Sequence, residues 1–237
     1  MSAMGLAVVA AGLGYLLGSL PVGVIVCRAV GKDPRLVGSG RTGGTNVYRT
    51  AGLPAALATV TLDVLKGAFA AWLGFRLAGA APGGFGAGFG AAPVSADWST
   101  AWLAASCGAF AAIIGHNYSI LAGFRGGAGS SPNLGAIFVL DPWVGLAGCL
   151  ASLSILVGTR IASLASLTLA VIAAVAGLWR VATHGMPPAV LVYSVGQLIL
   201  VIWALRPNIA RLRAGTERRI GTSEPPEAAQ SAGLPDG

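Results

Sequence analysis

Lys and Arg (15 residues) together with Asp and Glu (8 residues) make up only 10% of this 237-residue chain, against about 25% in an average soluble domain. Hydrophobic residues make up 55%. This composition excludes a water-soluble monomer, and it excludes a disordered chain, because disorder requires low hydrophobicity and high charge density. We therefore expect an all-α, polytopic integral membrane protein.

Seven apolar segments are candidates for crossing the membrane. A spanning helix needs about 20 mostly apolar residues, and residues 1–27 provide them without a charge or the basic start of a signal peptide. The other candidates are residues 53–72, 101–115, 134–140, 144–157, 161–179 and 189–205. Residues 134–140 are too short to cross alone, so we expect them to extend backward through residues 120–123 as a broken or re-entrant helix. The sequence thus predicts about seven transmembrane helices, including short or broken ones.

The positions of Lys and Arg predict the orientation, because cytoplasmic loops carry an excess of them. The basic side chains next to the first and last spans are Arg28, Lys32, Arg35, Arg41, Arg49, Arg206, Arg211, Arg213, Arg218 and Arg219. We therefore predict an amino terminus outside, an external loop at residues 79–98, and a cytoplasmic carboxyl terminus. The charge of +7 is explained by this orientation without a nucleic-acid partner.

The carboxyl-terminal end is expected to consist of two parts. Residues 206–221 either anchor the chain against anionic lipid or complete a polar site. Residues 222–237 are rich in Pro, Ala, Ser, Glu and Gly and are expected to be a disordered tail. We expect a single membrane-embedded domain over residues 1–221.

Residues 38–49, GSGRTGGTNVYR, form the first polar segment between apolar ones. Its glycines allow backbone N–H groups to converge, and Ser39, Thr42 and Thr45 add hydroxyl donors. Arg49 offers a planar fork of donors that matches a phosphate group. The pattern is typical of an anion site, although an ordinary flexible loop of small residues is an open alternative. It is not a nucleotide P-loop, because the spacing GxxxxGK[ST] is absent.

Two pairs of polar residues lie inside apolar segments. Asp63 and Lys66 are three residues apart in the second segment, where ionisable groups indicate either function or an ion pair that packs helices. Ser163 and Ser166 share one helix face and either bond to a neighbouring helix or belong to a polar site.

Residues 115–129, GHNYSILAGFRGGAG, form a further polar segment. His116 directly follows an apolar helix, where a structural hydrogen bond and acid–base chemistry are both open interpretations. Arg125 precedes a glycine cluster, and this combination again suits an anion.

Cys27, Cys107 and Cys149 all lie within or beside apolar segments. Their number is odd and their spacing is unlike that of metal ligands, so we expect buried small side chains. With only two His residues in the chain, neither a metal site nor a cofactor is expected.

In chain order, the polar segments contain GSGxxGxTNxxR, LDxxKG, GHNxxxxxGFxGGxG, TRxxSLAS and NIxRLxxGTExxIG. Five separated motifs in this order resemble the bacterial acyl-phosphate glycerol-3-phosphate acyltransferase family over about residues 5–221. The resemblance implies a seven-span enzyme of the bacterial inner membrane. It implies transfer of a fatty acyl group from acyl phosphate to the sn-1 hydroxyl of glycerol 3-phosphate, giving phosphate and lysophosphatidic acid for phospholipid biosynthesis. We expect it to act as a monomer among membrane lipids.

The motifs, with the chemistry of their side chains, provide the candidate site residues on loops that we expect to be cytoplasmic. The candidate catalytic residues are Ser39, Arg49 and His116. The candidate substrate-binding residues are Gly40, Arg41, Thr45, Asn46, Lys66, Asn117, Arg125, Gly126, Gly127, Gly129, Ser163 and Asn208. The donor phosphate is a further candidate for the base, as is proposed for the family.

The chain departs from the family's pattern at several of these positions. Arg41 stands where the family usually has Asn, Ala128 where its GGKG motif has a functional Lys, and Leu205 where its tail motif has His. The stretch at residues 130–132, normally VAT-like, is SSP. One positive charge is lost and one gained, so we hypothesise that Arg41 restores the charge of the site.

Two other classes of function stay open at this point. A diverged paralogue could use another acyl donor or acceptor, or only bind anionic lipid precursors. A transporter for a small anion should show an internal repeat, and the sequence has none beyond its general Gly and Ala richness.

Overall fold

The structure, a computed structural model, describes residues 1–80 and 97–221. Within them the chain forms nine α-helices and two short 3-10 turns, with no strand. The helices are α1 (Ala3–Gly18), α2 (Val22–Ala29), α3 (Gly44–Ala51), α4 (Leu53–Leu77), α5 (Trp98–Asn117), α6 (Ser130–Leu140), α7 (Pro142–Thr159), α8 (Ala162–Thr183) and α9 (Val190–Arg213), and the turns are η1 (Pro34–Leu36) and η2 (Ile120–Ala122). The predicted tail at residues 222–237 and most of the predicted external loop lie outside the described residues.

The predicted all-α membrane architecture is confirmed. Six helical stretches among the described residues are long and apolar enough to span a bilayer, and α6, with eleven residues, is a shorter apolar helix. Large apolar side chains such as Val8, Leu57, Leu153 and Val175 point outward and are more than half exposed. Alanines form much of the interior instead. This arrangement suits a lipid environment, where apolar side chains are stable on the outer surface.

Two details differ from the expected spans. Residues 1–27 do not form one helix. Pro21 lacks the N–H that would continue α1, so the helix is interrupted between Gly18 and Val22, where α2 begins. The expected backward extension of residues 134–140 through residues 120–123 is wrong. Residues 120–122 form a turn directly after α5, and α6 begins only at Ser130, after a glycine-rich loop.

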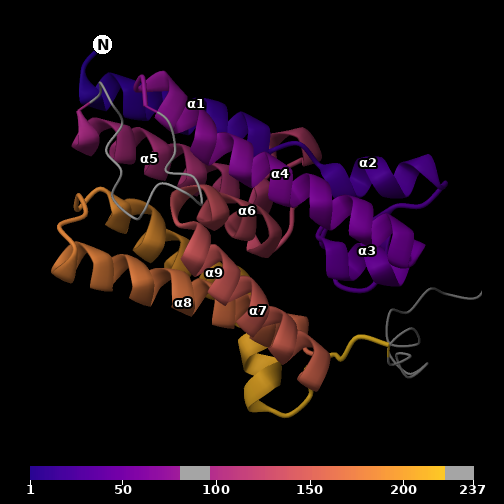
Figure 1. The fold of residues 1–237 in the computed structure, drawn as a ribbon. Coiled ribbons are helices and arrows are strands. Elements are labelled where there is room, and N and C mark those ends of the chain that lie inside the picture. The colour runs from indigo at the N-terminus through magenta and orange to yellow at the C-terminus, as the bar shows by residue number, and fades with distance from the viewer. Residues whose placement is uncertain (81–96, 222–237) are drawn as a thin grey trace, which may run out of the picture.

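Small residues bring the helices into backbone contact. A Cβ atom at Gly14 would overlap the carbonyl group of Gly108, so α1 and α5 approach closely, and a Cβ atom at Gly135 would overlap the carbonyl group of Val64 between α6 and α4. Figure 1 shows α1, α4 and α5 on one side of α6, and α7, α8 and α9 on the other. The short helix α6 therefore lies at the centre of the bundle, and its first residues are held at one end of it.

A buried polar network joins α6 to the last two helices. Asn133 donates from Nδ2 to Oε1 of Gln197 at 2.9 Å, and Gln197 donates in turn to the carbonyl oxygen of Ala170 at 2.8 Å. The Tyr193 hydroxyl donates to the Asn133 carbonyl oxygen at 3.1 Å. Because these polar groups are satisfied inside an apolar environment, the network fixes the position of α6 against α8 and α9.

Candidate active site

A cavity of about 150 Å³ lies where helices α3, α6 and α8 begin and α9 ends. Its walls come from six separate parts of the sequence: the segment before and within α3, Val60 of α4, the end of α5, the glycine loop with the start of α6, the start of α8, and the end of α9 with the residues after it. Four of the polar segments that the sequence singles out thus meet at one end of the bundle.

Three helix amino termini face this cavity. Gly44 and Thr45 of α3, Ser130 and Ser131 of α6, and Ala162 with Ser163 of α8 all line it. None of these three helices is capped by a side chain of the residues described here. The first-turn N–H groups and the positive ends of three helix dipoles therefore point toward one volume, which favours an anion there.

Arginine side chains add positive charge to the same cavity. Arg41 donates from one guanidinium nitrogen to Oδ1 of Asn208 at 3.1 Å and from another to the carbonyl oxygen of Ala204. Burial, and then the nearby Arg211 guanidinium, lower the pKa of Arg41 from its ordinary value, although an arginine stays protonated. Arg49 and Arg218 also line the cavity. A bound anion would relieve the repulsion among these cations.

Glu217 organises the wall formed by α8, α9 and the segment after α9. Its carboxylate accepts hydrogen bonds from Oγ of Ser163 at 2.9 Å, from Nδ2 of Asn208 at 2.6 Å and from Nε of Arg211 at 2.9 Å. The Glu217 side chain is 5% exposed. Since its oxygens are used by these donors, Glu217 orients the surrounding side chains.

Asn46 holds the loop that precedes α3. Its amide nitrogen Nδ2 donates to the carbonyl oxygens of Pro34 at 2.7 Å, Val37 at 3.0 Å and Arg41 at 2.8 Å, and its Oδ1 accepts from the Ser39 N–H at 3.0 Å. These bonds occupy the side-chain amide inside the protein. Asn46 therefore shapes the loop that presents Ser39 and Arg41.

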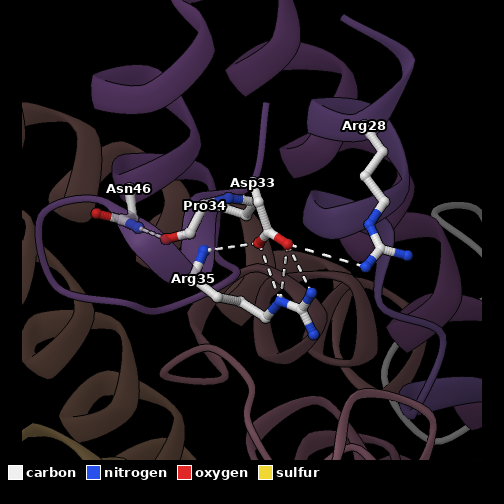
Figure 2. A network of polar contacts seen from close by, with 5 residues as sticks. All are labelled: Arg28, Asp33, Pro34, Arg35 and Asn46. Atoms are coloured by element: carbon white, nitrogen blue, oxygen red, sulfur yellow. Dashed lines mark hydrogen bonds and ion pairs between the residues drawn. The ribbon is translucent and has the colours of Figure 1, made fainter. Parts of the chain in front are cut away.

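A second set of contacts fixes the start of the same loop (Figure 2). Asp33 accepts hydrogen bonds from the backbone N–H of Arg35 at 3.0 Å and from the Arg35 guanidinium, with Arg28 at 3.9 Å on the outside. These hydrogen bonds from Arg35 lower the pKa of Asp33 to about 2. The turn at Pro34 that results carries the carbonyl oxygen to which Asn46 donates (Figure 2).

The glycine loop packs directly against the end of α5. The Gly127 N–H donates to the carbonyl oxygen of His116 at 3.1 Å, and the Thr42 N–H donates to the carbonyl oxygen of Gly126 at 3.3 Å. A Cβ atom at Gly126 would overlap the His116 carbonyl oxygen, and a Cβ atom at Gly127 would overlap Nε2 of the His116 imidazole. Glycine is therefore required at both positions, because the loop and the histidine share this space.

His116 also contacts a buried ion pair. Oδ1 of Asp63 lies 2.7 Å from Nζ of Lys66 and 3.4 Å from Nδ1 of His116. The side chains are 1%, 6% and 5% exposed, respectively. Lys66 donates further to the carbonyl oxygen of Leu20 at 2.9 Å, in the break between α1 and α2. The ion pair between Asp63 and Lys66, one of the two interpretations that the sequence left open, is therefore present in the structure. It contacts His116, which lines the cavity. A functional role of the two residues stays a prediction.

Most of the candidate site residues are brought together by the fold. Those that line the cavity are Ser39, Arg41, Thr45, Asn46, Arg49, His116, Gly127, Gly129, Ser163 and Asn208. Their roles in substrate binding and catalysis stay predictions, but their convergence is a property of the structure.

Five candidates lie outside the cavity wall: Gly40, Lys66, Asn117, Arg125 and Gly126. Gly40 forms a turn with a φ of +67°, and the Arg125 side chain is exposed. The Lys66 ammonium group is bound to Asp63 and Leu20, and Gly126 contacts the backbone of α5. Asn117 is buried next to Gly129. Any effect of these residues on a substrate is therefore indirect in this conformation.

Several cavity residues were not among the candidates: Ser130, Ser131, Ser166, Arg211, Glu217 and Arg218. The tail residues could have been found through the motif GTE and its neighbouring arginines, since the interpretation that residues 206–221 complete a polar site leads to them. Ser166 could have been found as the partner of Ser163 on one helix face, whereas Ser130 and Ser131 carry no comparable signal, because short hydroxyl side chains are common in apolar helices. Within residues 1–80 and 97–221, no group of three or more His, Cys, Asp or Glu side chains could hold a metal ion.

Known proteins resemble this chain over most of its length. The model of the family described as "Glycerol-3-phosphate acyltransferase" matches residues 8–215. A glycerol-3-phosphate acyltransferase of Rippkaea orientalis is 41% identical over 91% of this chain and 94% of its own length. The enzyme of the same name from Thermus thermophilus is 37% identical over 88% of this chain and 92% of its own length.

Solved structures agree with the sequence comparison. PlsY (YgiH), an integral membrane glycerol 3-phosphate acyltransferase in its glycerol 3-phosphate form, aligns with a TM-score of 0.73 and 33% identity, covering 94% of this chain and 97% of PlsY. Its lysophosphatidic acid form aligns with a TM-score of 0.71 and 32% identity, covering 91% of this chain and 96% of PlsY. Together with the all-helical membrane fold, these matches show that the chain belongs to the glycerol-3-phosphate acyltransferase family.

Proposed function

We propose that this protein transfers a fatty acyl group from acyl phosphate to the sn-1 hydroxyl of glycerol 3-phosphate, releasing phosphate and lysophosphatidic acid. The observation that carries the proposal is the cavity where three helix amino termini meet the side chains of Arg41, Arg49 and Arg218. The relatives that match this chain have the corresponding name, and PlsY has been solved in glycerol 3-phosphate and lysophosphatidic acid forms.

The chemistry requires two anions to approach each other. Acyl phosphate is a mixed anhydride with a good leaving group, so the protein needs no acyl intermediate of its own. The donor phosphate and glycerol 3-phosphate repel each other in the absence of positive charge. Helix amino termini and arginines offset this repulsion and stabilise the oxyanion that develops on the carbonyl oxygen of the acyl group. Each such donor typically contributes ~3 to 4 kcal/mol to the transition state, and fixed orientation of the reactants contributes more.

The test is an acyl-transfer assay with the purified protein in lipid nanodiscs. Radiolabelled acyl phosphate is supplied with glycerol 3-phosphate, without it, or with glycerol in its place, and acyl-CoA serves as a competing donor. We expect labelled lysophosphatidic acid only when acyl phosphate and glycerol 3-phosphate are both present. Binding of glycerol 3-phosphate without any transfer would overturn the proposal and favour a non-catalytic paralogue, and transfer only from acyl-CoA would show that the donor is different.

We also propose that the cavity faces the cytoplasm of a bacterial inner membrane and that the protein acts as a monomer. The hydrogen bond from Arg41 to Asn208 joins the two arginine-rich segments at one end of the bundle, which supports the orientation by the excess of positive charge in cytoplasmic loops. A fluorescent reporter that matures only in the cytoplasm, fused to the carboxyl terminus, should fluoresce. Mass measurement in nanodiscs should give one copy for each disc.

A further inference from the structure

The start of α6 presents two hydroxyl groups to the cavity. Ser130 and Ser131 both line it, at positions where the VAT-like stretch of the family has apolar side chains. They follow Gly129, whose φ of +86° is left-handed. A left-handed residue followed by helical ones makes successive backbone N–H groups converge on one side of the chain. Amide and hydroxyl donors are therefore concentrated at this turn.

Ser131 lies on the side of α6 that faces α4 and the start of α3. It stands four residues before Gly135, which contacts the Val64 carbonyl group of α4, and residues four apart share one face of a helix. Val60, one turn before Val64, lines the cavity together with Ser131. Gly44 at the start of α3 packs on Val60, because a Cβ atom there would overlap the Val60 side chain. The Ser131 side chain is thus placed between the starts of α3 and α6.

The Ser131 hydroxyl group is available to a ligand, whereas that of Ser130 is used inside the protein. Ser130 donates from Oγ to Oγ of Ser166 at 2.6 Å, which joins the starts of α6 and α8. The Ser131 hydroxyl forms no hydrogen bond with residues 1–80 or 97–221. Pro132, the next residue, has no N–H, so α6 has one backbone donor fewer than other helix starts. The hydroxyl group of Ser131 makes up for that missing donor.

A buried amide next to the same turn also lacks a partner. Asn117 is 5% exposed and lies against Gly129, where an added Cβ atom would come within 2.9 Å of Oδ1. Neither Oδ1 nor Nδ2 of Asn117 forms a hydrogen bond with a described residue. Buried polar groups are normally satisfied by the protein, by ordered water or by a ligand. The Asn117 amide is therefore an independent indication that a polar ligand reaches the start of α6.

We propose that Ser131 is a substrate-binding residue whose hydroxyl group donates to a phosphate group held between the starts of α3 and α6. The uncapped first turns of both helices line this part of the cavity and add backbone donors. A hydrogen bond to a charged oxygen is shorter and stronger than one between neutral groups. This inference rests on the proposed function, since the phosphate group is that of acyl phosphate, of glycerol 3-phosphate or of the released phosphate.

The first measurement is binding, which needs no turnover. Wild type and variants in nanodiscs are titrated calorimetrically with inorganic phosphate, glycerol 3-phosphate and a non-hydrolysable acyl phosphonate. Ser131→Val should raise Kd about tenfold for at least one of these probes, which corresponds to one hydrogen bond to a charged group. The probes that are weakened identify the phosphate group that Ser131 contacts. Ser131→Thr, which has the shape of Val but keeps a hydroxyl group, should stay within about threefold of wild type. Equal Kd values for the Thr and Val variants would overturn the proposal.

The matched control is a serine on another helix. Ser154 lies on α7, is exposed, and donates within its own helix to the Leu150 carbonyl oxygen at 2.8 Å. Ser154→Ala should leave every Kd within about 1.5-fold of wild type, whereas Ser131→Ala should weaken binding as Ser131→Val does. Both alanine variants should unfold near the wild-type temperature, because Ala is favourable inside a helix. Equal weakening by the two alanine variants would refute a specific role for Ser131.

Steady-state kinetics separate substrate binding from a purely structural role. Ser131→Ala should raise KM for the affected substrate about tenfold, while kcat changes less than about threefold. A lower kcat with unchanged Kd values would show that Ser131 only shapes the fold, and would contradict the inference. If acyl transfer is absent but Ser131→Val still weakens binding of a phosphate probe, the proposed function fails and this inference stands. If transfer occurs and no Kd changes, the proposed function stands and this inference fails.

Discussion

The helix amino termini are mostly capped by side chains at one end of the helix bundle and lack such caps at the other end. At the end away from the cavity, three of the four helices that begin there are capped by side chains: the N–H groups of Gly5, Ser99 and Val144 donate to Ser2, Asp97 and Asp141, respectively. At the cavity end, α3, α6 and α8 begin without a side-chain cap from the described part of the chain. Figure 1 shows α1 and α5 starting at one end and α2 and α3 lying at the other.

The two ends also contain different carboxylates, a buried one at Asp63 and a half-buried one at Asp141. Asp141 caps α7 through the Val144 N–H at 3.0 Å and pairs with Nε of Arg180 at 2.5 Å, so both of its interactions hold helices together. Asp63 pairs with Lys66 and also contacts His116, which lines the cavity. Ion pairs thus occur at both ends, but the helix N–H groups are capped mainly at one end, whereas at the other end uncapped N–H groups and an imidazole line a cavity.

Gly127→Ala is the change expected to have the largest effect. The new Cβ atom would occupy the space of Nε2 of His116, so the imidazole and the glycine loop must separate. Loss of one positioned hydrogen-bond donor in an active site typically lowers kcat about 100- to 1000-fold. Because the glycine loop would be displaced, we expect the rate of acyl transfer to fall by this range, measured as the initial rate with saturating substrates.

The matched control for this change is Gly12→Ala. Gly12 lies in α1, and a Cβ atom there would meet nothing within 4 Å. Activity should stay within about twofold of wild type, because Ala is favoured over Gly inside a helix. Equal losses in both variants would indicate that the protein tolerates no added methyl group, and the distinction between the cavity end and the remainder of the bundle would fail.

Asp141→Asn should lower the stability of the protein without lowering its kcat, in contrast to Gly127→Ala. An asparagine still caps α7, but Arg180, whose side chain is 11% exposed, loses its carboxylate. Breaking a buried pair in this way costs about 3 kcal/mol, which should appear as a lower unfolding temperature in detergent. The kcat of the folded protein should be unchanged. A kcat loss as large as that of Gly127→Ala would remove the contrast between the two ends of the bundle.

The fold could be predicted from the sequence more completely than the site. Spans are set by runs of apolar residues, and these are local. The motifs identified Arg49 and His116 because ionisable side chains are rare in membrane proteins unless they are needed, and Ser39 because it lies in the same polar segment as Arg49. The partner of His116 could not be predicted, because the relation between Asp63 and His116 depends on the packing of α4 against α5. The start of α6 was also missed, since the boundary between a glycine-rich loop and a short apolar helix has no distinct pattern.

Arg41→Asn tests whether Arg41 replaces the positive charge of the lysine that the family has at the position of Ala128. Arg41 reaches Ala204 and Asn208, on either side of Leu205, and Ala128 packs near Leu205. A lysine at position 128 would therefore bring its charge to the same part of the cavity. We expect Arg41→Asn to lower kcat/KM for glycerol 3-phosphate about tenfold, and Ala128→Lys added to it to recover most of that loss.

The control for this charge is Arg206→Asn. Arg206 lies at the same end of α9, but its guanidinium stacks 4.2 Å from the centroid of the Trp203 ring and does not line the cavity. Its loss should change kcat/KM less than about twofold. If Arg41→Asn has no larger effect than Arg206→Asn, the hypothesis that Arg41 compensates for Ala128 is wrong.

Asp33→Asn should have the smallest effect of these changes. Asp33 lies near the surface and acts only by fixing the start of the loop before α3. The pKa of Asp33 is lowered to about 2, against about 4 in an unfolded chain, so its contribution is complete above pH 4 and is lost between pH 4 and 2. At pH 7, amide hydrogen exchange of residues 35–40 should be about two- to threefold faster in the variant. After correction for intrinsic rates, wild type should approach the variant near pH 2. Asp97→Asn, at the capped end, should leave these amides unchanged, and a faster exchange there would show that the two ends are coupled.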